Sequence, residues 1–369
     1  MKKKTVVIAM SGGVDSSVSA WLLKKYKYKV IGLFMKNWEE NDTDNYCASK
    51  KDLKDAKKVC KIIKIPFYKI NFSIEYWENV FLKFLSGLKK GLTPNPDILC
   101  NKEIKFKVFL KFSLKYFKAD FIATGHYANI KIINKNFFLK KGLDKKKDQT
   151  YFLYTLKQKQ LKKIIFPIGK FNKFKIRKIA EKLNLPTAYK KDSFGICFIE
   201  NKNFQKFLKK YISKKEGYIV NISGKIIGIH HGIQNYTIGQ RKKIGKILNK
   251  KNTYNSPWYI VEKNVEKNLL IVANSFNNPY LMSVGALINN INLLVNIDFE
   301  KYFFCKLKIR HQYNDISCMV KLKKKCILKI IFKYPISSIT TGQSIVLYFN
   351  KICIGGGIIF KKFPLINIL

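Results

Sequence analysis

The sequence predicts an α/β protein in which a parallel sheet comes first, a small middle domain follows, and an antiparallel β-barrel ends the chain. In the first 125 residues, β-branched apolar runs alternate with segments of helical spacing, as in βαβ units. After about residue 205, glycine-bearing turns separate short strands, and from about residue 283 the pattern is almost purely β. We therefore expect three domains, at 1–205, 206–280 and 281–369.

The N-terminal part contains four expected strands and four expected helices. The strands are Thr5–Ala9, Val30–Met35, Phe67–Phe72 and Phe121–Thr124, and the helices are Ser16–Lys25, Leu53–Ile63, Glu75–Leu88 and Glu103–Phe117. Because strands and helices alternate, the sheet should be parallel and covered on both faces. Ligands in such sheets bind beyond the carboxyl ends of the strands.

The remainder of the chain contains only short expected strands. They are Tyr218–Asn221, Lys225–Ile229, Tyr259–Glu262, Leu269–Val272, Val320–Leu322, Cys326–Phe332, Ser344–Phe349 and Lys351–Ile354. Their density toward the C-terminus predicts the small closing barrel.

The composition excludes several classes of protein. Hydrophobic residues make up 47% of the 369 residues, enough for sizeable cores. The 8 cysteines form no CxxC pair and there are only 4 histidines, so neither a disulfide scaffold nor a metal site is expected. The N-terminus lacks a secretion signal, and the longest uncharged run, 268–297, is broken by Pro279. We expect a soluble, cytoplasmic protein with reduced thiols.

The net charge of +49 has two interpretations. It favours a nucleic-acid partner, because phosphates reward clustered positive charge. It also fits a genome of AT-rich codons, since lysine supplies nearly all of it and the only arginines are Arg177, Arg241 and Arg310. The arginines are the stronger candidates for phosphate contacts because a guanidinium can donate two hydrogen bonds to the same phosphate group.

A glycine-rich turn lies between the first strand and the first helix. It runs Ser11-Gly12-Gly13-Val14-Asp15-Ser16-Ser17. Glycines let the backbone approach an anion, and a helix N-terminus supplies unpaired N–H groups. Asp15 is unexpected beside an anion unless it holds magnesium or positions a helix amide. The turn is neither a Walker loop nor a GxGxxG motif.

This SGGVDS string resembles the signature of the PP-loop ATP pyrophosphatases, whose catalytic domain is similar to the adenine nucleotide alpha-hydrolases. The resemblance implies that the loop grips the phosphates of ATP, that magnesium arrives with ATP, and that the enzyme transfers AMP to a substrate oxygen. The implied ATP-binding residues are Ala9, Met10, Ser11, Gly12, Gly13, Val14, Asp15, Ser16, Met35 and Gly125.

A cysteine and an aspartate stand close together in the string Pro94–Glu103. The prolines fix a turn that leads into the helix expected from Glu103, so Cys100 should lie near a helix N-terminus, where a thiolate is favoured. Asp97 is placed to act as a general acid or base. A second site, Asp192–Ile199, holds Cys197 after a flexible Gly195. Cys60 and Cys326 are expected to be buried and inert.

These two strings and the glycine-rich turn together resemble the tRNA-specific 2-thiouridylases of bacteria. Further matching strings occur along nearly the whole chain in the order typical of that family: Leu33–Glu40, Thr124–Tyr127, Asp148–Leu153, Thr237–Lys242 and Gly355–Gly357.

The resemblance implies a mechanism in which sulfur replaces an oxygen of tRNA. ATP would adenylate the C2 oxygen of the wobble uridine. Cys197 would carry sulfur as a persulfide from a donor or relay protein and attack C2, and Cys100 would complete the transfer as a Cys100–Cys197 disulfide forms. Release of free hydrosulfide before the attack is the alternative order. Asp97 would be the acid–base catalyst.

The resemblance also implies where tRNA is bound, with the protein acting as a monomer. The implied contacts are Asn95, Pro96, Asp97, His126, Lys147, Asp148, Gln149, Arg310, His311 and Gln343. Arg241 either contacts tRNA or braces the middle domain. Three residues depart from the family pattern: Phe194, His311 and Thr341 stand where a small polar residue, a tyrosine and a proline are usual.

Two other functions compete with sulfur transfer. One is a PP-loop ligase acting on a small molecule, which would not need Cys100 and Cys197. The other is a tRNA-binding protein that has lost its chemistry, for which the intact loop, Asp97 and both cysteines are unexpected.

Overall fold

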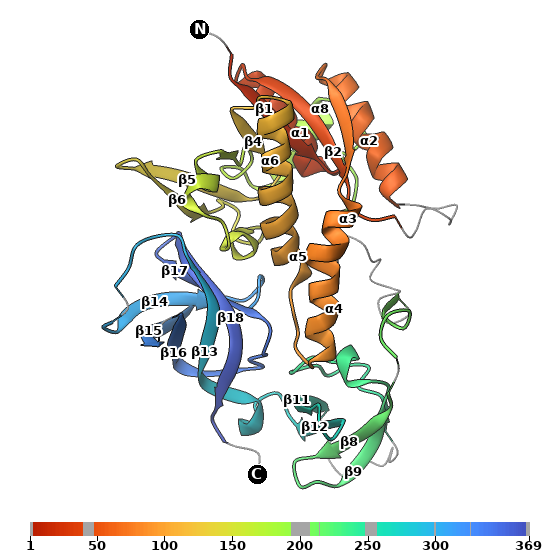
Figure 1. The fold of residues 1–369 in the computed structure, drawn as a ribbon, viewed down its shortest axis with the longest axis vertical. Coiled ribbons are helices and arrows are strands. Elements are labelled where there is room, and N and C mark those ends of the chain that lie inside the picture. Colours follow the sequence, from red (N-terminus) through yellow and green to blue (C-terminus); the bar gives the residue numbers. More distant parts are fainter. Residues whose placement is uncertain are drawn as a thin grey trace.

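The computed structural model describes residues 3–39, 48–192, 207–213, 215–247, 257–298, 300–324 and 326–366. Three units are visible in Figure 1: a layered α/β domain with the N-terminus, a small sheet near the opposite end, and a barrel beside it. The expected α/β domain followed by a small middle domain and a terminal barrel is confirmed. Among the described residues, no helix is long and apolar enough to span a membrane.

A five-stranded parallel sheet forms the centre of the first domain. Its order is β3-β2-β1-β4-β7. The strands are β1 (Thr5–Met10), β2 (Lys29–Lys36), β3 (Phe67–Asn71), β4 (Phe121–Ala123) and β7 (Ile164–Ile165). The central strand β1 is apolar from Val6 to Met10, where it is buried on both faces.

Helices cover both faces of this sheet. Val6 and Ile8 of β1 face α1 (Val14–Lys25), α2 (Ala48–Ile62) and α8 (Lys173–Lys182). The alternate residues Val7 and Ala9 belong to a second core. That core includes residues of two long helical columns: α3 (Ser73–Tyr76), η1 (Trp77–Phe81) and α4 (Leu82–Lys89), then α5 (Pro96–Leu99), η2 (Cys100–Val108) and α6 (Phe109–Tyr116).

The second helical column starts earlier than the sequence predicts. It begins at Pro96, seven positions before the expected Glu103. Asn95 is the N-cap, and its Oδ1 accepts hydrogen bonds from the backbone N–H groups of Asp97 (3.0 Å) and Ile98 (3.1 Å). Proline fits the first helical position because its missing N–H has no helical partner there. The motif interpreted as a turn is therefore a capped helix start.

A hairpin absent from our sequence prediction ties the first domain to the barrel. It consists of β5 (Ala128–Ile133) and β6 (Asn136–Lys141), and β6 pairs with β18 through Lys140 and Ile352. Short turns of helix follow, at η3 (Thr150–Leu153) and α7 (Gln158–Leu161).

The middle domain is a five-stranded sheet with its own core. Its order is β10-β9-β8-β12-β11, and η4 (Ile233–Asn235) packs beside it. The strands are β8 (Gly217–Asn221), β9 (Ile226–His230), β10 (Lys246–Ile247), β11 (Trp258–Asn264) and β12 (Leu269–Asn274).

Six antiparallel strands close the terminal barrel. After η5 (Pro279–Leu281), they are β13 (Met282–Leu293), β14 (Phe303–Lys308), β15 (Ile316–Lys324), β16 (Ile327–Ser337), β17 (Ser344–Phe349) and β18 (Ile352–Pro364). Pairing of β13 with β18 completes the ring. Cys326 is exposed in the β15–β16 turn with φ 68°, so its expected burial is wrong. A residue at an apolar position of a strand-like sequence pattern is not buried if the chain turns at that residue.

Candidate active site

The glycine-rich turn forms a compact loop at the start of α1. Ser16 Oγ accepts a hydrogen bond from the backbone N–H of Ser11 (3.2 Å) and donates one to the carbonyl of Gly13 (3.0 Å). Ser17 Oγ donates to the same carbonyl at 2.8 Å. Gly13 is the N-cap of α1, and no side chain of the described residues caps it. The first amides of this 12-residue helix are therefore available to an anion.

Two glycines are required by close approaches around this loop. A Cβ on Gly12, which has φ +70°, would lie 2.3 Å from the carbonyl oxygen of Asp52 in α2. A Cβ on Gly125 would lie 2.8 Å from the amide nitrogen of Ser16. The end of β4 therefore abuts residues 11–17, which we call the phosphate loop after their predicted role, at the carboxyl edge of the sheet where ligands of such folds bind.

Asp15 is neutralised by a lysine that the sequence analysis did not single out. Its carboxylate accepts hydrogen bonds from the Tyr127 hydroxyl (2.7 Å) and from Lys173 Nζ (2.8 Å). Burial, together with the charge of Asp15, raises the pKa of Tyr127, so the phenol stays protonated as the donor. Neutralisation by Lys173 explains how an acidic residue is tolerated at an anion-binding helix terminus.

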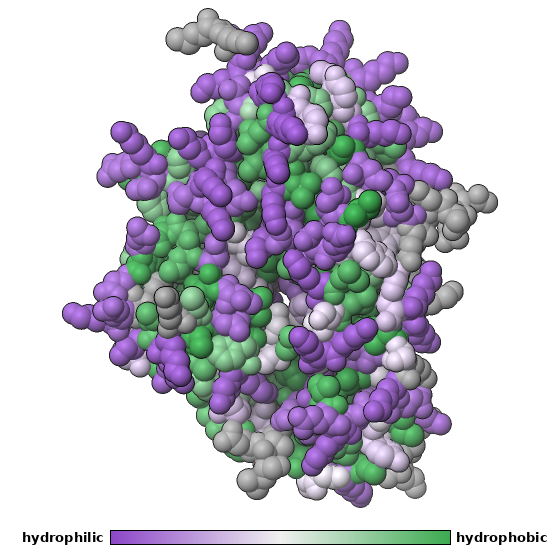
Figure 2. Space-filling view, viewed as in Figure 1, coloured by the Kyte–Doolittle hydropathy of each residue, from purple (hydrophilic) through white to green (hydrophobic). Residues whose placement is uncertain are grey.

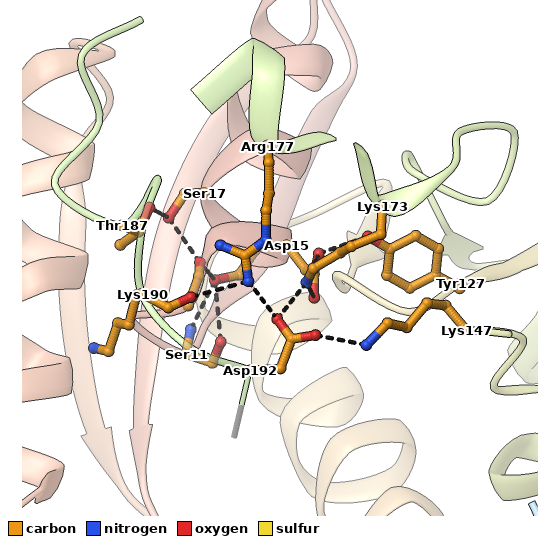
Figure 3. A network of polar contacts seen from close by, with 12 residues as sticks. Ser11, Asp15, Ser17, Tyr127, Lys147, Lys173, Arg177, Thr187, Lys190 and Asp192 are labelled. Atoms are coloured by element: carbon orange, nitrogen blue, oxygen red, sulfur yellow. Dashed lines mark hydrogen bonds and ion pairs between the residues drawn. The ribbon is translucent and has the colours of Figure 1, made fainter. Parts of the chain in front are cut away.

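Asp192 joins three cations beside the loop (Figure 3). It contacts Lys147 (2.6 Å), Lys173 (2.7 Å) and Arg177 (3.0 Å). Burial alone would raise the pKa of Asp192, but hydrogen bonds from Lys147 and Lys173 and their charges lower it to about 2. Lys173 therefore bridges Asp15 of the phosphate loop and Asp192.

The lowered pKa of Asp192 predicts a pH-dependent loss of stability in the Asp192→Asn variant. In the wild-type protein the stabilisation is present above pH 3.8 and is lost as the pH falls toward about 2. The variant should be less stable at neutral pH because it loses these ion pairs. The loss should be only on the order of 1 kcal/mol, because solvent screens the charges of this partly exposed group. Urea unfolding at neutral pH and near pH 3 measures the difference. Glu266→Gln, at an exposed acid, is the control; a difference that does not narrow in acid would contradict the assignment.

Cys100 and Asp97 lie on the second helical column. Cys100 is 1% exposed and follows the N-cap Asn95 by five residues, so it lies within the helix, beyond its first turn, and not at the N-terminus of a helix as the sequence predicted. Burial raises the pKa of Asp97, and the charge of Lys105 opposes that shift in part. A carboxyl with a raised pKa suits proton transfer near neutral pH.

The segment with the second predicted cysteine lies outside the described residues. Cys197 and Phe194 belong to it, so the distance between Cys100 and Cys197 is not part of the structure. Asp192 is the last described residue before this segment.

Most of the predicted tRNA contacts gather where the first domain meets the barrel. His311 Nε2 lies 2.7 Å from the carbonyl oxygen of Asp148, although the two residues are 163 positions apart. Arg310 Nε donates to Gln343 Oε1 at 3.4 Å. Gln149 Oε1 accepts from the backbone N–H of Tyr127 at 3.0 Å. Their contact with tRNA stays a prediction.

Three of these predicted contacts also have internal partners. The carboxylate of Asp148 is buried and accepts from Gly142 N–H (3.1 Å) and Thr150 Oγ1 (3.0 Å). His126 is buried, lies 2.8 Å from Thr124 Oγ1, and has a pKa well below its ordinary value because of burial and the charge of Lys105. Lys147 pairs with Asp192.

The phosphate loop suits an anion because the first amides of its helix are not capped by a side chain of the described residues. The described residues contain no group of three His, Cys, Asp or Glu side chains able to hold a metal ion. Asp15, an acid of the loop itself, is already paired with Lys173.

The surface is largely hydrophilic on the face shown in Figure 2, in keeping with the large excess of lysine.

Comparison with known families covers nearly the whole chain. Residues 4–201 match the tRNA methyl transferase HUP domain, residues 205–274 the tRNA methyl transferase PRC-barrel domain, and residues 284–359 the aminomethyltransferase beta-barrel domain. Proteins named tRNA-specific 2-thiouridylase MnmA are similar over the full length. That of Buchnera aphidicola subsp. Acyrthosiphon pisum is 55% identical, with 99% of each chain covered. That of Blochmanniella floridana is 52% identical (99% of each chain), and that of Escherichia coli O6:H1 is 48% identical (98% of each chain).

Proposed function

Because the chain belongs to the family of tRNA-specific 2-thiouridylases, MnmA, we propose that it uses ATP to replace the C2 oxygen of the wobble uridine in tRNA by sulfur. It is an enzyme, a tRNA sulfurtransferase. Two of the matching domain families carry a tRNA methyl transferase description. The glycine-rich loop and the match over the full length to proteins named tRNA-specific 2-thiouridylase favour ATP-activated sulfur transfer instead.

The observation that carries the proposal is the loop at the start of α1. No side chain of the described residues caps the first amides of the helix at Gly13, and the backbone packs so closely at Gly12 and Gly125 that a Cβ there would clash with it. The phosphates of ATP would bind these amides, and the adenine would lie near Met35 and Gly125. Magnesium would arrive with ATP and shield the phosphates.

The first step would make the C2 oxygen a leaving group. The oxygen attacks the α-phosphorus of ATP, and pyrophosphate departs. Ordered amides at the helix terminus stabilise the charge that develops on the departing pyrophosphate. Asp97, with its raised pKa, would exchange protons with the uridine.

The second step would exchange oxygen for sulfur. The terminal sulfur of a Cys197 persulfide attacks C2, and AMP leaves with the C2 oxygen. The Cys100 thiolate then attacks the sulfur of Cys197, which breaks the bond to the transferred sulfur and forms a Cys100–Cys197 disulfide. A thiol reductant supplies two electrons to restore both thiols. If Cys100 instead attacks the persulfide first, free hydrosulfide is the attacking species.

We also propose that tRNA lies across the junction of the first domain and the barrel. Arg310, Gln343 and Lys147 are near that junction and offer donors to phosphate or base. A uridine in the anticodon loop would be splayed out to reach Asn95, Pro96 and Asp97. We expect a cytoplasmic monomer that receives sulfur from a persulfide donor or relay protein.

Mass analysis of the tRNA tests this function. Substrate tRNA is incubated with the protein, Mg-ATP and a sulfide or persulfide source. The proposal predicts that sulfur replaces oxygen at the wobble uridine only when ATP is present. Pyrophosphate release that requires a small amine or carboxylate rather than tRNA would instead favour a small-molecule ligase.

A further inference from the structure

The segment after α8 contacts the phosphate loop directly at two places and once more through Lys173. Thr187 Oγ1 donates to Ser17 Oγ at 3.1 Å. Lys190 Nζ donates to the carbonyl oxygen of Gly12 at 3.0 Å. Asp192 reaches the loop through Lys173, which it contacts at 2.7 Å. Residues 187–192 therefore pack against the proposed nucleotide-binding loop, a contact that the sequence did not reveal.

We propose that Lys190 is a positioning residue for ATP, which holds the Gly12 carbonyl so that the next N–H points toward the phosphates. This inference rests on the proposed function. A trans peptide is planar, so its carbonyl and its N–H point in opposite directions. The carbonyl of Gly12 and the N–H of Gly13 belong to one peptide. Fixing the first therefore orients the second.

The surroundings of Gly12 explain why this orientation needs a partner. Gly12 has φ +70°, and because glycine adopts many backbone conformations at little steric cost, rotation of the peptide that turns a carbonyl oxygen toward the phosphates is sterically allowed. The backbone of Asp52 packs closely against Gly12, where a Cβ would lie 2.3 Å from the Asp52 carbonyl oxygen. A hydrogen-bond donor on the Gly12 carbonyl opposes rotation of the peptide, and Lys190 supplies that donor.

Two carboxylates hold Lys190 in place. Its Nζ lies 2.7 Å from Asp52 and 2.5 Å from Asp55, both on α2. Burial lowers the pKa of Lys190, but these hydrogen bonds and charges outweigh burial and raise it, so the ammonium stays charged. Its side chain is 23% exposed. The lysine is thus anchored on α2 and acts on the loop through one hydrogen bond.

The test compares Lys190→Met with Lys24→Met. Lys24 is a matched control because it also donates to backbone carbonyls, of Ile63 and Lys64, but lies at the far end of α1. For Lys190→Met we expect KM for ATP, and Kd for a non-hydrolysable ATP analogue, to rise about tenfold or more. The kcat at saturating ATP and KM for tRNA should stay near wild type. A merely structural role would lower the active fraction, and hence kcat, and leave KM unchanged.

A triple variant separates orientation from charge. Lys190→Met leaves Asp52 and Asp55 unneutralised near the phosphates, which alone could weaken binding. Adding Asp52→Asn and Asp55→Asn removes both charges but leaves the Gly12 carbonyl without its donor. The inference predicts that KM for ATP stays raised, and a return to the wild-type value would overturn it. Wild-type protein that does not use ATP with tRNA would overturn the proposed function itself.

Discussion

Cys100→Ser is expected to abolish formation of 2-thiouridine while adenylation continues. A serine hydroxyl cannot attack the sulfur of Cys197, so transferred sulfur is not released. We expect thiolation to fall by on the order of 10³-fold or more. Pyrophosphate release from ATP in the presence of tRNA should remain, because it precedes the step that needs the thiol. Both products are measured in one reaction, by mass analysis of the tRNA and by a pyrophosphate assay.

Two further cysteine variants make this result specific. Cys197→Ser should lose thiolation to the same extent, because the persulfide cannot form on serine. Cys326→Ser changes an exposed cysteine on the barrel and should leave both activities at wild-type levels. Retained thiolation in Cys100→Ser and Cys197→Ser would contradict the mechanism and favour a ligase that needs neither thiol.

The Asp97→Asn substitution is expected to lower the activity of the protein but to raise its stability at neutral pH. Asparagine cannot take up a proton from the uridine, so thiolation should fall by about 10²–10⁴-fold. The folded protein should become more stable at neutral pH, because the variant no longer buries a carboxylate. Burial raises the pKa of Asp97 above 3.8, so the wild-type protein loses stability as the pH rises through that raised pKa. The gain in the free energy of unfolding of the variant over the wild-type protein should therefore vanish below about pH 3.8.

Thermal unfolding across this pH range and single-turnover assays measure the two effects. Asn95 Oδ1 bonds the backbone N–H of residue 97 rather than its side chain, so the helix cap survives the substitution. A variant that is both inactive and less stable at neutral pH would show that Asp97 supports the fold rather than the chemistry.

Periodicity predicted the parallel sheet well and the motif boundaries less well. Short apolar runs rich in β-branched residues, such as Thr5–Ala9, rarely form any structure other than a buried strand. The start of the helix at Pro96 was missed because proline and asparagine indicate a turn as readily as a helix cap. The hairpin 128–141 was missed because both its strands alternate weakly, and its pairing with β18 is a long-range contact that no local pattern carries.

The phosphate loop could be predicted from sequence, whereas its supports could not. SGGVDS is a local string that, after a strand, predicts an anion-binding turn. Lys173 and Lys190 occur among 72 lysines and arginines, so neither has a sequence signal. Only the fold brings them to Asp15 and Gly12. The same holds for Tyr127, whose contact with Asp15 spans 112 positions.

The fate of the C2 oxygen tests the central claim most directly. Substrate tRNA is prepared with oxygen-18 at C2 of its uridines and is incubated with the protein, Mg-ATP and the sulfur source, and the AMP is then analysed by mass. If ATP activates this oxygen and sulfur displaces it, one oxygen-18 atom appears in AMP for each 2-thiouridine formed. AMP that carries no label, formed together with 2-thiouridine, would contradict the account.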